Sequence, residues 1–202
     1  MTVDVIGAEV AGKEREESMA EKDAVQQHKN LSDMEEQELF LQQWECNDLM
    51  YEYNQVRPSD QEKRERLLRE LLGKVGEACI VEQPIRANWG KHTYLGDRVY
   101  INFNLTLVDD AEVWIGDDVK IGPNVTIATA THPLEADQRK QGIQMNRPVH
   151  IKNGVWLGAG VIVLPGVTIG ENTTIGAGSV VTTDIPANVV AYGIPCRVRK
   201  RL

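Results

Sequence analysis

A small apolar residue returns every six positions across most of residues 95–186, and this spacing restricts the possible folds more than any other feature of the chain. The register shifts by two residues around Asp109 and Asp110, and it is kept across the long interval between Ile127 and Ile151. Gly or Ala usually follows the repeating residue. The repeating residues are Leu95, Ile101, Leu107, Ile115, Ile121, Ile127, Ile151, Leu157, Val163, Ile169, Ile175 and Val181.

A period of six matches neither the repeat of about 3.6 residues in an α-helix nor the alternation of a half-buried strand. It fits a short strand followed by a tight corner, with three strands closing one triangular coil. The apolar residue then points to the coil axis, and Gly or Ala lets the chain turn without a Cβ clash. Stacked coils bury a continuous aliphatic column. An ordinary sheet would need every spacing to be a coincidence, so the sequence predicts a mainly β fold, a parallel β-helix over residues 76–202.

The first 75 residues have a different character. Residues 1–30 are rich in Glu, Lys, Gln and Ala and predict a disordered or loosely helical extension. Residues 31–75 predict a helical hairpin, broken at Arg57-Pro58 and stopped at Gly73, with a capping box at Ser32–Glu35 and another at Ser59–Glu62, each with Ser at the cap. Such a hairpin would cover an open end of the β-helix, where strand edges are unpaired.

Charge and cysteine content exclude several classes of partner. Residues 1–73 hold 18 Asp and Glu against 9 Lys and Arg, and residues 74–202 hold 12 against 13. This acidic balance, without a basic stripe, argues against nucleic-acid binding. No apolar run is long enough for a bilayer and no signal peptide is evident, so no membrane partner is expected. The 3 cysteines form no CxxC pair and predict reduced thiols in a cytoplasmic protein.

The repeat stops at Thr131-His132-Pro133 and gives way to a polar, aperiodic segment, which predicts an extended loop over residues 132–148. His132 stands where the rigid coil ends, so it is a candidate general base, with a surface or packing histidine as the alternative. A three-histidine zinc site would need clustered imidazoles, and His92, His132 and His150 offer no close pair. No metal is therefore expected, and no role is assigned to His28, His92 or His150.

Several segments together resemble the maltose/galactoside O-acetyltransferase family, which includes the nodulation-type sugar acetyltransferases. The resemblance covers roughly residues 32–202. It implies a left-handed β-helix, against the usual right-handed crossover rule, and a homotrimer with active sites between neighbouring prisms. Its segments are the hexads, Thr131-His132-Pro133, Met50–Asn54, Asn102–Asp110, Val155–Gly160 and Gly193–Arg197.

The resemblance implies direct transfer of acetyl from acetyl-CoA to a hydroxyl of a sugar or similar small acceptor. His132 would be the general base, Asn102 would bind and orient the acceptor, and the backbone N–H of Ala159 would stabilise the oxyanion. The acceptor-binding positions implied are Asn102, Asp110, Asn88, Asp33 and Gln144. The coenzyme-binding positions implied are Trp156, Ala159, Ala177, Thr182, Thr183, Arg197 and Lys200.

Simpler interpretations stand beside these roles. Asn102 could bridge a coil corner, Thr182 and Thr183 could be exposed strand residues, and Trp156 could be a subunit-interface aromatic. Asp109-Asp110 could be a turn pair, and the basic residues 197–201 a solvated tail.

The acceptor pocket departs from the family, since Ile143 stands where Glu is expected and Asn88 stands where a galactoside-type member has Ser. Three functions therefore remain open: a sugar O-acetyltransferase, a related acyltransferase acting on an amine or drug hydroxyl, and a non-catalytic trimeric scaffold.

Overall fold

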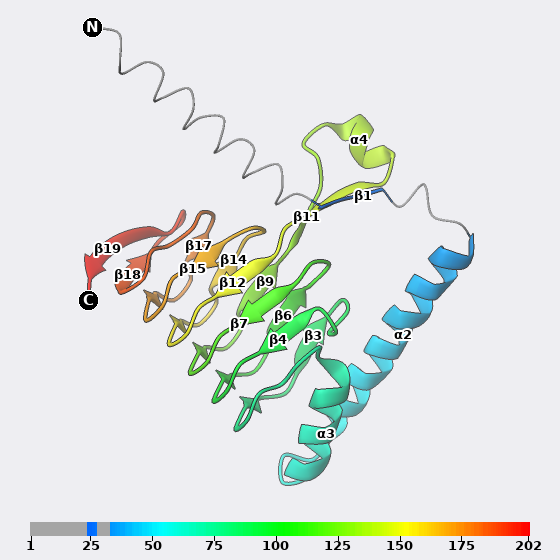
Figure 1. Ribbon diagram of the computed structural model, residues 1–202, viewed down its shortest axis with the longest axis horizontal. Helices are drawn as coiled ribbons and strands as arrows, with labels where there is room; N and C mark the ends of the chain where they lie inside the picture. The colour runs from blue at the N-terminus through cyan, green and yellow to red at the C-terminus, as the bar shows by residue number, and fades with distance from the viewer. Residues whose placement is uncertain (1–23, 28–32) are drawn as a thin grey trace, which may run out of the picture.

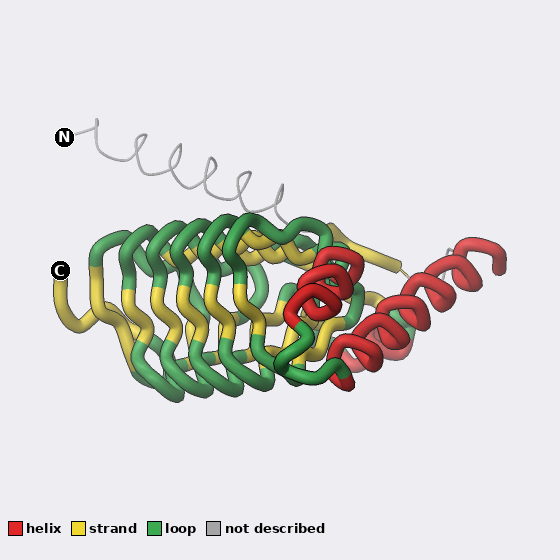
Figure 2. The backbone as a smooth tube through the Cα atoms, turned by 90° about the horizontal axis from the view of Figure 1, so that it is seen from below, coloured by secondary structure: helices red, strands yellow, loops and turns green. Residues whose placement is uncertain are grey.

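The computed structural model describes residues 24–27 and 33–202. Most of this part is a left-handed parallel β-helix, a triangular prism of stacked coils (Figures 1 and 2). Each coil places one short strand on each face in turn, which we call faces 1, 2 and 3. The prediction of a mainly β fold with hexapeptide coils, a helical hairpin and an extended loop is confirmed.

In the described part of the chain, each face is a sheet whose strands pair in parallel from coil to coil, except that β19 is antiparallel. Face 1 consists of β4 (Thr93–Leu95), β7 (Val113–Ile115), β12 (Val149–Ile151) and β15 (Thr168–Ile169). Face 2 consists of β2 (Ile80–Val81), β5 (Tyr100–Ile101), β8 (Lys120–Ile121), β13 (Trp156–Leu157), β16 (Thr174–Ile175), β18 (Val189–Tyr192) and β19 (Arg197–Arg201). Face 3 consists of β3 (Ile85–Ala87), β6 (Leu105–Val108), β9 (Thr126–Ala128), β14 (Ile162–Val163) and β17 (Val180–Val181).

The core is the column of hexad residues. Every repeating residue named above is at most 3% exposed. Successive coils align these residues directly, so that Leu95 pairs with Ile115 and Ile115 with Ile151 on face 1. Burying each such side chain contributes about 1.5–3 kcal/mol, and the in-register stacking is what makes the contributions continuous along the prism.

The shift of two residues in the repeat corresponds, in the structure, to an enlarged corner between faces 3 and 1. The side chain of Asp109 turns inward there and is fully buried. Its carboxylate accepts hydrogen bonds from the backbone N–H groups of Asn88 (3.0 Å) and Trp89 (2.9 Å) and from the hydroxyl of Thr93 (3.1 Å). Burial raises the pKa of Asp109, and these donors oppose the rise.

Two helices close the N-terminal end of the prism (Figure 2). They are α2 (Asp33–Gln55) and α3 (Gln61–Leu71). Tyr53 of α2 donates its hydroxyl to the backbone carbonyl of Val81 at 2.6 Å, which ties the hairpin to the first coil. The predicted cap at Ser59 is wrong by one residue: Asp60 is the N-cap of α3, and its carboxylate accepts from the N–H of Lys63. The other predicted cap, Ser32, lies outside the described residues.

An excursion leaves the prism between β9 and β12 (Figure 1). It contains β10 (Ala130–Thr131), the short helix α4 (Ala136–Lys140) and β11 (Ile143–Asn146). β11 pairs with β10 over two residues and, on its other edge, with β1 (Ala24–Gln27) over four. Residues 24–27 therefore form a strand in place of the predicted disordered or loosely helical state. The rest of the prediction for residues 1–30 lies outside the described residues. The free edge of β11 supplies the pairing partner that composition alone does not reveal. None of the helices described is long and apolar enough to cross a membrane.

Replacing Ile121 by Ala should lower the free energy of unfolding by about 2–5 kcal/mol, because the buried cavity it leaves cannot collapse between stacked coils. Guanidinium denaturation followed by circular dichroism measures the loss. The neighbouring exposed residue Lys120, replaced by Ala, is the matched control and should change stability by less than about 0.5 kcal/mol. Equal effects of the two substitutions would contradict the inward orientation of the hexads.

Removing residues 1–31 should speed tryptic cleavage after Arg139 or Lys140 in the excursion, because β11 then loses one of its two partner strands. Loss of a single hydrogen bond of about 1 kcal/mol raises the open population about fivefold. A chain lacking only residues 1–22 keeps β1 and should be cleaved as slowly as the full chain. Identical cleavage rates for both truncated chains would show that β1 does not support the excursion.

Candidate functional site

A polar cluster lies at the corner between faces 3 and 1. Asn88 follows β3 and Asp110 follows β6, and the pairing of these two strands brings both side chains together. The amide of Asn88 donates to one carboxylate oxygen of Asp110 at 3.0 Å, and the indole N–H of Trp89 donates to the other at 3.3 Å. Both oxygens of Asp110 are thus held by fixed donors. Trp89 is not among the residues predicted from the sequence, because only the stacking of the coils puts its indole beside Asp110.

His132 stands at the same corner, at the base of the excursion. Its side chain is exposed, and its Nδ1 lies 3.2 Å from the backbone carbonyl oxygen of Ile143 on β11. A carbonyl oxygen can only accept, so this contact requires a proton on Nδ1. In the neutral ring, Nε2 then carries a lone pair and can take a proton. The contact uses the main chain of Ile143, so the absence of Glu at this position does not remove it.

Two further predicted acceptor residues are Gln144 and Asp33. Gln144 neighbours Ile143 on β11, and its amide donates to the side-chain oxygen of Asn146 at 2.8 Å. This bond orients Gln144 along the strand. Asp33 is the first residue of α2, and its side chain lies outside the described residues.

A second group of predicted residues lies at the corner between faces 2 and 3. Asn102, Ala159 and Ala177 follow β5, β13 and β16. Asn102 accepts a hydrogen bond from the N–H of Phe103 at 2.8 Å, which fixes its side chain over its own corner. A Cβ on Gly158 would lie 2.6 Å from the backbone nitrogen of Ala177, so the close approach of the coils requires glycine. The backbones of neighbouring coils therefore lie in close contact at this corner.

The remaining predicted coenzyme residues are divided between face 2 and the corner between faces 3 and 1. Trp156 lies on face 2 and is 55% exposed, and Arg197 and Lys200 are exposed on β19 at the end of the same face. Thr182 and Thr183 follow β17 and therefore lie at the corner between faces 3 and 1. Within one chain, His132 and Asn102 are on opposite edges of face 3. Within one chain, the predicted residues therefore form separate groups at the two edges of face 3 and on face 2.

A small hollow of about 90 Å³ lies between α2 and the corner that carries Trp89. His92 lines it, stacks on Trp89 with ring centroids 5.6 Å apart, and has its Nδ1 2.7 Å from the carbonyl oxygen of Asp109. Cys46 also lines this hollow, and burial raises the pKa of its thiol to about 12. A thiol that stays protonated at neutral pH is not a nucleophile, so Cys46 has a packing role.

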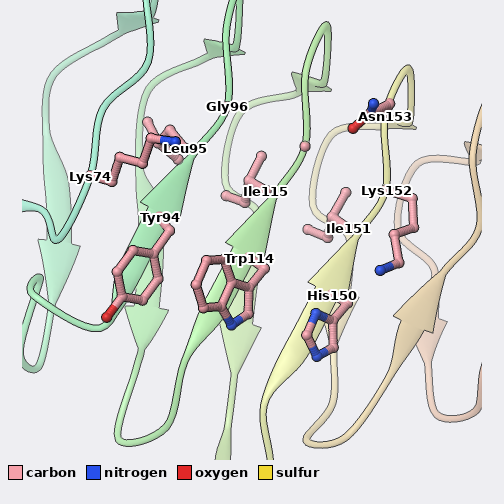
Figure 3. A pocket seen from close by; sticks show the side chains of 11 residues that line it. Lys74, Tyr94, Leu95, Gly96, Trp114, Ile115, His150, Ile151, Lys152 and Asn153 are labelled. Atoms are coloured by element: carbon pink, nitrogen blue, oxygen red, sulfur yellow. The ribbon is translucent and has the colours of Figure 1, made fainter.

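A larger hollow of about 240 Å³ lies on the outer side of face 1 (Figure 3). Tyr94 and Trp114 stack there with their ring centroids 4.2 Å apart, and His150 continues the row on the next strand. None of the residues predicted for the site lines this hollow. Elsewhere too, the described residues contain no group of three His, Cys, Asp or Glu side chains able to hold a metal ion.

Comparison with known proteins identifies the family. Residues 32–76 match the maltose acetyltransferase hexapeptide capping motif, and residues 148–183 match the bacterial transferase hexapeptide of six repeats. A galactoside O-acetyltransferase of Lactococcus lactis is 50% identical over 83% of this chain and 81% of its own length.

Two solved structures share the fold. A galactoside acetyltransferase in complex with coenzyme A has a TM-score of 0.79 at 48% identity and covers 81% of this chain and 82% of its own. A hexapeptide-repeat acetyltransferase of Vibrio cholerae complexed with acetyl coenzyme A has a TM-score of 0.79 at 34% identity and covers 82% and 89%. The sequence identity extends across both the helical hairpin and the coils. The chain therefore belongs to the maltose/galactoside O-acetyltransferase family of hexapeptide-repeat acyltransferases.

Proposed function

We propose that the protein transfers acetyl from acetyl-CoA directly to a hydroxyl of a sugar or similar small acceptor. Membership of the family supports the reaction class. The observation that carries the mechanism is the contact between Nδ1 of His132 and the carbonyl of Ile143, because it leaves Nε2 as the proton acceptor. A base held in one tautomer by a main-chain group needs no acidic partner.

His132 takes the proton of the acceptor hydroxyl as that oxygen attacks the thioester carbonyl carbon. The backbone N–H of Ala159 stabilises the negative charge that develops on the carbonyl oxygen. The carbon–sulfur bond then breaks, and the imidazolium of His132 returns its proton to the departing thiolate. No acyl-enzyme forms in this scheme, in keeping with the inert thiol of Cys46.

The acceptor is held by the Asn88, Trp89 and Asp110 cluster, with Gln144, Asp33 and Asn102 as further contacts. The carboxylate of Asp110, already oriented by two donors, accepts a hydrogen bond from an acceptor hydroxyl. The indole of Trp89 offers an apolar face to the carbon side of a sugar ring. Asn88 and Ile143 alter the walls of the pocket relative to the family pattern, so we assign the acceptor as sugar-like without choosing between maltose and a galactoside.

The coenzyme is bound by Trp156, Ala159, Ala177, Thr182, Thr183, Arg197 and Lys200. Ala159 and Ala177 lie with Asn102 at one edge of face 3, and Thr182 and Thr183 lie with His132 at the other. Trp156, Arg197 and Lys200 lie on face 2. A homotrimer packed around face 3 joins the edge of one copy to the opposite edge of the next and completes three shared sites. The free cysteines and the use of acetyl-CoA fit a cytoplasmic location.

Replacing His132 by Ala should lower thiol release from acetyl-CoA by about 100-fold or more, because the hydroxyl loses its base. The measurement uses a panel containing maltose, a galactoside, a primary amine and an aminoglycoside, so it also separates a hydroxyl acceptor from an amine. His150→Ala, outside the site, is the control and should keep turnover. Unchanged turnover in H132A would remove His132 from the mechanism, and a wild-type protein inactive on the whole panel would favour the scaffold.

Mixing two inactive variants tests whether the sites are shared. After refolding together, H132A and N102A chains should recover activity, because roughly a quarter of the sites then combine an intact His132 with an intact Asn102 from different copies. Each variant refolded alone is the control. If the mixture stays as inactive as its components, then both residues of a site come from one chain.

A further inference from the structure

The imidazole of His92 touches both chain segments that form the proposed acceptor cluster. Its ring stacks on the indole of Trp89, with centroids 5.6 Å apart and planes at 29° to each other. Its Nδ1 lies 2.7 Å from the carbonyl oxygen of Asp109. A carbonyl oxygen can only accept, so Nδ1 carries the proton and donates it. His92 therefore joins the segment that carries Trp89 to the segment that carries Asp110.

The orientation of the Trp89 indole decides whether its N–H reaches Asp110. The backbone N–H of Trp89 is fixed on the carboxylate of Asp109 at 2.9 Å, but a side chain on a fixed backbone still has several rotamers. The indole bond to Asp110 spans 3.3 Å, which is longer than a typical N–H···O bond, so it holds the ring only weakly. The stacked ring of His92 restricts the indole further.

His92 is held in turn by the first coils and by α2. Its side chain is half-buried. Its main-chain carbonyl accepts the N–H of Val113 in the next coil at 2.9 Å. Cys46 and Leu49 of α2 line the small hollow beside its imidazole. Functional side chains keep their geometry when packing and hydrogen bonds lock the residues around them. His92 has both kinds of restraint, so it can serve as a firm support for Trp89.

We propose that His92 is a positioning residue for acceptor binding, which keeps the indole N–H of Trp89 on Asp110. This inference rests on the proposed function, in which Trp89 and Asp110 contact a sugar-like acceptor. An indole N–H on one carboxylate oxygen leaves the other lone pairs of Asp110 in fixed directions for an acceptor hydroxyl. A turned indole releases that oxygen and moves its apolar face, so the acceptor binds less tightly. The proposed coenzyme contacts involve none of these residues.

Steady-state kinetics with the best acceptor of the panel tests the assignment. His92→Ala should raise the KM for the acceptor about fivefold, the effect of losing one hydrogen bond, and should leave the KM for acetyl-CoA unchanged. His92→Phe keeps a planar ring against Trp89 and loses only the donor, so it should raise the acceptor KM less. Lys91→Ala is the matched control and should change neither KM. Lys91 lines the same hollow, and its ammonium group donates to the carbonyl of Glu70 on α3.

A double-mutant cycle shows whether His92 acts through the indole. Trp89→Phe removes the indole N–H and keeps an aromatic ring. The double variant H92A/W89F should raise the acceptor KM by clearly less than the product of the two single effects, because both substitutions break the same link. A full product would show that the residues act independently and would overturn the proposal. Equal rises in both KM values of H92A would also overturn it, since they indicate a general loss of structure.

Hydrogen exchange at the indole separates this inference from the proposed function. The chain has 4 tryptophans, and the ¹⁵N-indole resonance that disappears in W89F belongs to Trp89. Its N–H should exchange with deuterium about fivefold faster in H92A and at the wild-type rate in K91A. Faster exchange in a protein that acetylates no acceptor would contradict the proposed function and keep the support of Trp89 by His92. Unchanged exchange in an active enzyme would overturn this inference and leave the proposed function intact.

Discussion

The in-register stacking of aliphatic side chains along the prism axis is the constraint on which the rest of the molecule depends. Each coil is too small to bury its own apolar residues, so a coil is stable only between neighbours. Leu95, Ile115 and Ile151 show this on face 1, where each lies directly over the next. A shift in register would unstack the column, so every corner of every coil has a defined position. Side chains at the corners are therefore held in defined positions as well.

The groups proposed to act on the acceptor lie where the chain departs from this regularity. The two extra residues near Asp109 enlarge one corner, and the buried carboxylate fills it while holding the N–H groups of Asn88 and Trp89. That arrangement leaves Asp110 facing outward between two donors. The excursion after β9 leaves from the same corner one coil further on, and it supplies both His132 and the carbonyl that orients it. A stiff scaffold thus fixes the positions of residues in the irregular segments.

Much of this can be predicted from the sequence, and the failures have physical causes. The hexads predict which residues are buried because the period maps directly onto the coil geometry. Trp89 is missed because its partner, Asp110, is brought near only by pairing of β3 with β6. Ser59 is predicted as the cap in place of Asp60 because both residue types favour that position, and in the structure the carboxylate of Asp60 accepts the N–H of Lys63. The strand at residues 24–27 is missed because its sequence is unremarkable until the edge of β11 is present.

The sequence by itself determined the coil, the interruption that bears His132, and the family resemblance, because all three are local patterns or fixed spacings. Only the tertiary structure decided that the Nδ1 of His132 lies against a main-chain carbonyl and that His132 and Asn102 lie at opposite edges of one face. It also decided that the guanidinium of Arg199 lies over the ring of Tyr192. Such relations join residues far apart in the chain, and they exist only after the coils have stacked.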